Sequence, residues 1–280
     1  MTLLLSVALA VVLGTLIYFA VTSLPFLAVS PTSDPTFGRI NECLLAAVPS
    51  RVGFAVSRDA RRALAWSSDL AVECVDGEPA AAKTVWKVGG VVDAAYDGEQ
   101  RLWLAVHAED STNLQIMEPG GPRPIGKVAP QHLVGTAVGV VVLEPGGRLV
   151  SVHADGAVGG LVDLQPMENV QLTASADGAR VALVVGGGMY VFEAASLAKL
   201  RGEAPCDLEY LWWLRDEADT GPTRHHAQLA CGPEASWGLT IDVDSNAQEK
   251  ATPPRERAVL AGPRGPYVRR CDMLPCTAEL

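Results

Sequence analysis

The sequence predicts an all-β protein, built from repeated groups of four short strands, that follows a single N-terminal transmembrane helix. Three observations lead to this fold class. No side chain between Thr2 and Val29 is charged, four later segments repeat a turn followed by an apolar strand, and no later stretch keeps a helical period over about three turns. Four strands in roughly 40 residues is the repeat of a β-propeller blade, so we expect five or six blades.

The apolar segment over residues 1–29 is long enough to cross a bilayer. A helix rises about 1.5 Å per residue, so roughly 20 apolar residues span a hydrocarbon core about 30 Å thick. A cleaved signal peptide is the alternative, but it would have a basic start, whereas this chain has no Lys or Arg before Arg39. We therefore predict an uncleaved anchor that contacts the lipid bilayer through residues 3–29. A polar tether is expected over residues 30–36.

Six cysteines lie beyond the apolar segment: Cys43, Cys74, Cys206, Cys231, Cys271 and Cys276. An even number of cysteines after a membrane-targeting segment favours disulfides in an oxidising compartment. We expect bonds from Cys43 to Cys74 and from Cys206 to Cys231. Cys271 and Cys276 would bond each other or close the C-terminus, for example onto Cys43. Free thiols and a metal site are the alternatives, although no Cys-x2-Cys pair is present.

Composition limits the partners. The net charge of −10 argues against nucleic acid, which requires clustered Lys and Arg, and against anionic lipid headgroups as the main docking surface. Disulfides and the anchor together predict a cytoplasmic N-terminus and a domain over residues 37–280 in a periplasm or an equivalent extracytoplasmic space. Within it we expect a flexible loop over residues 244–257 and a closing segment over residues 258–280.

Four segments of this domain share a polar turn, an arginine and an alternating apolar strand. Their arginines are Arg62, Arg101, Arg148 and Arg180, separated by 39, 47 and 32 residues. A fifth unit is expected between Leu208 and Val243. Ring closure needs a strand from one terminus, and Phe37–Val48 and Arg257–Arg270 are the candidates. A pair of β-sandwiches is the competing fold.

The segment Ser175-Ala-Asp-Gly-Ala-Arg-Val-Ala-Leu183 resembles the S-P-D-G-x-x-x-A-[LF] turn of TolB-type propeller repeats, which also occurs in many WD40-like bacterial propellers. Ala176 stands where that pattern has Pro. Ser57-Arg-Asp-Ala-Arg-Arg-Ala-Leu64 matches less well because it lacks the Gly. The resemblance covers about residues 50–245 and implies the class of repeat only. TolB's additional N-terminal domain has no room before the first repeat, so its partners are not transferred.

Motifs for catalysis or cofactor binding are absent, since the chain has no G-x-S-x-G elbow, no Walker A loop and no H-E-x-x-H. We predict no catalytic residue and no cofactor. His107 and His153 fall at similar places in neighbouring units, where we expect them on one face of the ring. With Asp110 and Asp155 they form a candidate metal or acid–base site. The alternative is that they are equivalent turn residues without a shared ligand.

Paired aromatic side chains and paired histidines occur in the fifth unit. On a strand, Trp212 and Trp213 would point to opposite faces, so one could contact a partner, and packing between blades is the alternative. His225 and His226 end the polar stretch Glu217–His226, which we expect to be a solvated loop.

The function predicted from the sequence is that of a membrane-anchored, non-catalytic scaffold or accessory subunit of a membrane or envelope protein complex. A rigid ring with variable loops suits binding to other membrane or envelope proteins. The alternative is a metal-binding or lactonase-like hydrolytic propeller that uses His107 and His153.

Overall fold

The computed structural model describes residues 35–77, 79–86, 90–108, 111–126, 128–167, 170–214, 225–233, 236–245, 247–251, 258–262, 265–270 and 277–279. The chain divides into two compact units, Met1–Asp34 and Pro35–Leu280, and all that follows concerns the second. The predicted anchor over residues 1–29, Cys271 and Cys276 lie outside the described residues. No helix within the described ranges is both long and apolar enough to cross a bilayer.

The described strands form six antiparallel sheets. The first contains β1 (Gly53–Val56), β2 (Arg62–Trp66), β3 (Ala71–Val75) and β4 (Ala81–Trp86). The second contains β5 (Val91–Tyr96), β6 (Leu102–Ala108), β7 (Ser111–Glu118) and β8 (Gly121–Pro124). The third contains β9 (His132–Gly135), β10 (Gly139–Leu143), β11 (Arg148–His153) and β12 (Val158–Asp163).

The fourth sheet contains β13 (Gln171–Ala174), β14 (Arg180–Val185), β15 (Gly188–Glu193) and β16 (Lys199–Arg201). The fifth contains β17 (Leu208–Trp213), β18 (His226–Cys231), β19 (Trp237–Asp242) and β20 (Gln248–Ala251). The sixth has three described strands, β21 (Ala258–Gly262), β22 (Gly265–Arg270) and β23 (Thr277–Glu279).

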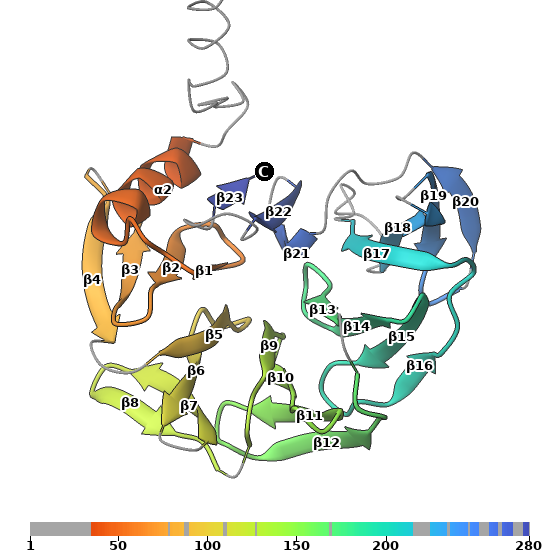
Figure 1. The fold of residues 1–280 in the computed structure, drawn as a ribbon, viewed down its shortest axis with the longest axis horizontal. Coiled ribbons are helices and arrows are strands. Elements are labelled where there is room, and N and C mark those ends of the chain that lie inside the picture. Colours follow the sequence, from red (N-terminus) through yellow and green to blue (C-terminus); the bar gives the residue numbers. More distant parts are fainter. Residues whose placement is uncertain are drawn as a thin grey trace, which may run out of the picture. The chain divides into compact units, whose positions relative to one another are not determined.

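First strands of successive sheets contact each other: β1 with β5, β5 with β9, β9 with β13, and β17 with β21. In addition, β13 of the fourth sheet contacts β21 of the sixth. Figure 1 shows these sheets following one another around a common centre. Separate four-stranded sheets arranged in this way form a β-propeller, as the sequence predicts, and not a pair of sandwiches.

The repeat is more regular than its arginines suggest. The second strands of the first five sheets begin at residues 62, 102, 139, 180 and 226, which are 40, 37, 41 and 46 residues apart. Arg62 and Arg180 open second strands and Arg101 directly precedes one, but Arg148 opens β11, a third strand. The alignment of the third unit on Arg148 is therefore wrong, and this explains the uneven spacing of the arginines.

A helix, α2 (Pro35–Ala47), occupies the region where the sequence suggested a closing strand at Phe37–Val48. Ile40, Leu44 and Val48 are almost fully buried and recur every four residues, which places them on one helical face. This face packs on the first sheet through β2, β3 and β4. The expectation of no helical period after residue 29 is thus wrong here, and the predicted tether gives way to helix at Pro35.

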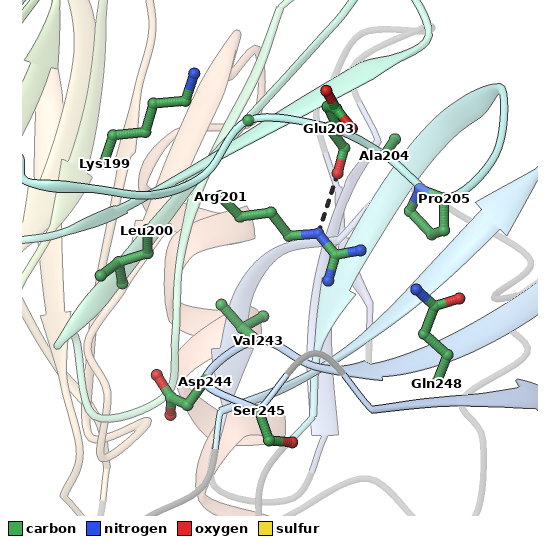
Figure 2. Close-up of a pocket in the computed structure, with 11 residues that line it drawn as sticks. Lys199, Leu200, Arg201, Glu203, Ala204, Pro205, Val243, Asp244, Ser245 and Gln248 are labelled. Atoms are coloured by element: carbon green, nitrogen blue, oxygen red, sulfur yellow. Dashed lines mark hydrogen bonds between the residues drawn. The ribbon is translucent and has the colours of Figure 1, made fainter.

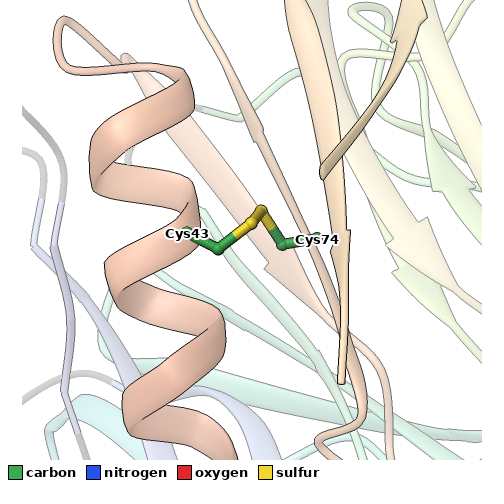
Figure 3. The surroundings of a disulfide bond; sticks show 2 residues. All are labelled: Cys43 and Cys74. Carbon is green, nitrogen blue, oxygen red and sulfur yellow. A yellow bond between two sulfur atoms is a disulfide. The ribbon is translucent and has the colours of Figure 1, made fainter. Parts of the chain in front are cut away.

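Both expected disulfides are confirmed. Cys43 of α2 bonds Cys74 of β3, with 6.2 Å between their Cα atoms, and so fastens the helix to the first sheet (Figure 3). Cys206 bonds Cys231 and links the start of the fifth sheet to the end of β18. Because Cys43 is already bonded, the alternative of a bond from Cys43 to Cys271 or Cys276 is wrong.

The C-terminal predictions need two corrections. Residues 248–251, placed by the sequence in a flexible loop over 244–257, form β20, which pairs with β19. In its described residues, the candidate closing strand Arg257–Arg270 contains the β21–β22 hairpin, and the strand paired with this hairpin is β23. β20 has the sequence Gln-Glu-Lys-Ala, which contains no apolar run to indicate a strand.

Apolar side chains fill the space between neighbouring sheets. Between the fourth and fifth sheets, Met189 and Val191 pack with Leu211, Trp213 and Leu229, all almost fully buried. Burial of such side chains contributes about 1.5–3 kcal/mol each relative to exposure. This packing holds β14 against β17 and brings the turn after β13 close to the start of β18.

Asp97 organises the turn after β5 although its side chain is fully buried. Its carboxylate accepts hydrogen bonds from the backbone N–H groups of Glu99 and Arg101, from Arg101 Nε at 2.7 Å and from the buried indole of Trp103 at 2.9 Å. The Asp97 carboxylate therefore holds in place the turn, Arg101 directly before β6, and the core residue Trp103.

Replacing Asp97 by Asn should lower the free energy of unfolding by about 1.5–3 kcal/mol, because an amide cannot accept all four bonds and leaves buried donors unpaired. The measurement is the midpoint of urea unfolding. Glu99→Gln is the matched control: Glu99 also pairs with Arg101, but its side chain is 70% exposed. That variant should change stability by less than about 0.5 kcal/mol, and equal losses in the two variants would contradict the role of Asp97.

Candidate functional site

The turns that follow the first strands gather at one end of the sheets. Gly98 N–H, after β5, donates to Thr136 O, after β9, at 2.7 Å, and Ala137 N–H donates to Gly178 O, after β13, at 3.0 Å. We call this end the turn face: residues 57–61, 97–101, 136–138 and 175–179, together with His225 and the turn 243–247 of the fifth sheet. Backbone hydrogen bonds therefore join turns of different sheets on this face, in addition to the bonds within each sheet.

Such close approach requires glycine. A β-carbon at Gly135 would lie 1.8 Å from the carbonyl oxygen of Tyr96, so no side chain fits there. Gly178 has φ of +70°, which L side chains rarely adopt, and a β-carbon there would lie 1.7 Å from the guanidinium of Arg58. The Asp177-Gly178 pair of the repeat turn therefore supplies both the backbone conformation of the turn and the space for Arg58 above it.

Arg58 reaches across the turn face from the first sheet. Its Nη2 donates to Gly135 O in the third sheet at 3.1 Å, and its guanidinium lies over Gly178 in the fourth. Burial lowers the pKa of Arg58, and the charges of Asp177 and Asp97 oppose this effect. The residue as a whole is half-buried.

His225 joins the fourth and fifth sheets. Its Nδ1 lies 2.5 Å from Asp244 Oδ2 and its Nε2 lies 3.0 Å from Asp177 Oδ2, while the histidine side chain is only 8% exposed. Arg180 Nε adds a bond of 3.1 Å to Asp244 Oδ1. Ionised carboxylates only accept hydrogen bonds, so a ring nitrogen of His225 bonds either aspartate by donating its N–H.

The two carboxylates are held in their charged form. For Asp177, burial disfavours the charge, but hydrogen bonds from Ser175, the Ala179 N–H and His225 outweigh it and lower the pKa. For Asp244, burial is likewise outweighed by His225 and Arg180, which lower its pKa. Arg180, His225 and the two carboxylates therefore form one cluster that bridges two sheets.

A pocket of about 640 Å³ lies beside this cluster, between the outer strand of the fourth sheet and the turn after β19. Figure 2 shows its lining, from Lys199 to Pro205 on one side and Val243, Asp244, Ser245 and Gln248 on the other. Arg201 points into it and donates from Nε to Glu203 O at 3.0 Å. Burial lowers the pKa of Arg201. The lining is polar, and it shares Asp244 with the His225 cluster.

The structure does not bring His107 and His153 together. His107 ends a second strand, and its N–H donates to Gly90 O before β5, at the end away from the turn face. His153 ends a third strand opposite Gly139, which follows the turn 136–138, and its Nε2 lies 3.4 Å from Ala195 O. The expectation that both emerge on one face is wrong, because it rested on the misaligned third unit.

The other predicted ligands add no cluster. Asp155 Oδ1 accepts from Ala157 N–H within its own turn, and Asp110 lies outside the described residues. No group of three metal-ligating side chains occurs in the described part of the chain. Trp213 is 3% exposed in the core, so the packing alternative is correct for it, and the side chain of Trp212 lies outside the described residues.

The sequence missed the role of His225. It was expected in a solvated loop, yet it is buried because Asp177 and Asp244 supply acceptors for both nitrogens. The available signal was the Asp-Gly turn of the fourth unit, whose carboxylate faces the next sheet. His226 begins β18 and pairs with Asp242, on the opposite side of the strand from its neighbour, as alternation requires.

No protein-family model and no curated protein sequence matches this chain. Among solved structures it is similar to a chain of the mitotic checkpoint complex, with a TM-score of 0.56 and 9% identity over 81% of this chain and 75% of that one. It is similar to the Cps50 (Swd1) β-propeller domain of Myceliophteria thermophila, with a TM-score of 0.51 and 12% identity over 75% of this chain and 76% of that one. It is also similar to BBS1N in complex with ARL6DN, with a TM-score of 0.51 and 11% identity over 74% of this chain and 70% of that one. At such low sequence identity, the similarity shows only that this chain shares the fold of these proteins.

Acid should weaken the His225 cluster. Since folding lowers the pKa of Asp177 and Asp244, their stabilisation is complete above the ordinary Asp value of about 3.9 and is lost as pH falls through the lower folded values. The wild-type melting temperature should therefore fall steeply below about pH 4. An Asp177→Asn, Asp244→Asn double variant should melt lower at pH 7 and lose less on acidification.

Asp155→Asn is the control, because this exposed carboxylate bonds only within its own turn. Its melting curve should follow the wild type from pH 7 to pH 3. If the double variant keeps the same pH slope as the wild type, the two carboxylates do not contribute in the charged form described above.

Proposed function

We propose that the chain is a membrane-anchored, extracytoplasmic β-propeller that serves as a non-catalytic scaffold or accessory subunit of a membrane or envelope protein complex. The observation that carries this proposal is the turn face, where bonds from Gly98 to Thr136 and from Ala137 to Gly178 fix the backbone of three sheets before any partner arrives. A surface that is already ordered loses little conformational freedom on binding.

Two further features support the proposal. The uncharged segment over residues 2–29 has the length of a transmembrane helix, which would hold the domain close to membrane partners. The Cys43–Cys74 and Cys206–Cys231 bonds suit an oxidising compartment, with the N-terminus in the cytoplasm. We further propose that β21–β23 represent a sixth blade, because β21 contacts both β13 and β17.

Two of the similar structures belong to protein assemblies, the mitotic checkpoint complex and the complex of BBS1N with ARL6DN. A propeller fold is therefore compatible with work as a subunit of a complex. The fold itself does not choose the partner, which has to be found by experiment.

Fractionation followed by purification tests the proposal. The full chain should stay with the membrane after carbonate washing, and a variant lacking residues 1–29 should be released. From membranes solubilised in mild detergent, the wild type should carry the same membrane or envelope protein in stoichiometric amount in repeated preparations. Release of the full chain by carbonate would contradict the anchor. A full chain that purifies alone would contradict the scaffold.

A further inference from the structure

Arg58 lies on the turn face without an ion-pair partner among the described residues, although the charges of Asp177 and Asp97 are near enough to act on it. We propose that it anchors a docking site there for a single acidic side chain, Asp or Glu, of a protein partner. The inference rests on the proposed scaffold function and names the chemistry that its binding surface recognises.

The fold positions this guanidinium. Arg58 leaves the turn after β1, crosses to the third sheet and donates from Nη2 to Gly135 O at 3.1 Å. It lies over Gly178, where any side chain would overlap it. Both supporting residues are glycines in sheets remote from Arg58 in sequence, so the side chain rests against backbone of two other sheets and is not a freely moving surface arginine.

The two nearby carboxylates already have other partners, so neither forms an ion pair with Arg58. Asp97 is committed to Arg101 at 2.7 Å, and Asp177 is committed to His225 at 3.0 Å. Among the described residues no carboxylate forms an ion pair with Arg58, and its hydrogen bond goes to a neutral carbonyl. A guanidinium carries five N–H donors in a planar fork, so most of them are left for a ligand.

A carboxylate fits this fork better than other anions. Two parallel N–H···O bonds give a bidentate pair, and the partial desolvation that lowers the pKa of Arg58 makes such a pair stronger than on an open surface. A polyanion is disfavoured by the net charge of −10 and by two exposed acidic side chains, Asp59 in the same turn and Glu99 in the turn after β5. One isolated acidic residue avoids that repulsion.

The surroundings favour a polypeptide as the source of the carboxylate. Ala137 and Val138, in the turn after β9, are exposed, and Val138 is 38% exposed. Ala137 N–H bonds Gly178 O, which places this apolar turn beside the glycine under the guanidinium. An extended segment could set its acidic side chain on Arg58 and its apolar neighbours on Val138.

The test uses the purified full chain in detergent and three pools of fluorescent nonapeptides, acetylated and amidated at their ends. The pools are random except for a central Glu, Gln or Lys. Wild type should retain the Glu pool about tenfold more strongly than the Gln pool, and the Lys pool least. Arg58→Gln should retain the Glu and Gln pools equally. Arg58→Lys should fall between, because it keeps the charge and loses the fork.

Arg61→Gln is the matched control. Arg61 belongs to the same turn and carries the same charge, but its side chain is exposed and makes no described contact with the other turns of the face. This variant should keep the preference of the wild type. Equal melting temperatures of the variants show that a lost preference is not a lost fold.

Three results would overturn the inference: no preference of the wild type for the Glu pool, the same preference in Arg58→Gln, or equal losses in Arg58→Gln and Arg61→Gln. Failure of the scaffold proposal is recognised separately, by a full chain that purifies without any partner. If the wild type carries its partner and Arg58→Gln carries as much of it, the scaffold stands and the role of Arg58 falls.

Discussion

Backbone hydrogen bonds between turns of different sheets are the constraint on which the rest of the described structure depends. Within each sheet the ladder bonds are local, but the bonds from Gly98 to Thr136 and from Ala137 to Gly178 join three sheets at one end. They form only because Gly135 and Gly178 let the chains approach more closely than a side chain allows. The apolar layers between sheets then determine the spacing, and the turns determine the shape of the surface.

The charged groups of the turn face follow from this geometry. With the turns held together, Asp177 meets His225 across the boundary between the fourth and fifth sheets, and Arg58 meets Gly135 and Gly178 from the first. On the turn face, buried Asp97 pairs with Arg101, and Asp177 and Asp244 both contact His225, whereas no ion pair of Arg58 is found among the described residues. The exception is why we place recognition at Arg58.

Much of the fold could be predicted from the sequence. The alternation of short apolar runs with Asp-Gly and Gly-Gly turns predicts the all-β repeat, and cysteine placement predicts both disulfides. The helix α2 was missed because its buried face has only Ile40, Leu44 and Val48 among small and polar residues. The third blade was misaligned because its first turn, Thr136-Ala137-Val138, lacks the Asp and the Arg of the others.

The candidate site was harder to predict, because it is assembled from five sheets. His107 and His153 have similar neighbours in sequence but lie on strands of opposite direction, so one register error placed them together. His225 and Arg58 had no sequence signal of their own: their partners Asp177, Asp244 and Gly135 are between 19 and 77 residues away. These pairs can be recognised only when the turns are seen beside one another in the folded structure.

Hydrogen exchange of the turn-face amides tests the account most directly. Gly98 N–H and Ala137 N–H belong to turns, which ordinarily exchange quickly, but here both bond to the turn of another sheet. The account predicts that these two amides are protected about as well as those in the middle of β6 and β10. Exchange as fast as that of Gly146, an exposed glycine in the turn before β11, would contradict a turn face that is ordered before a partner binds.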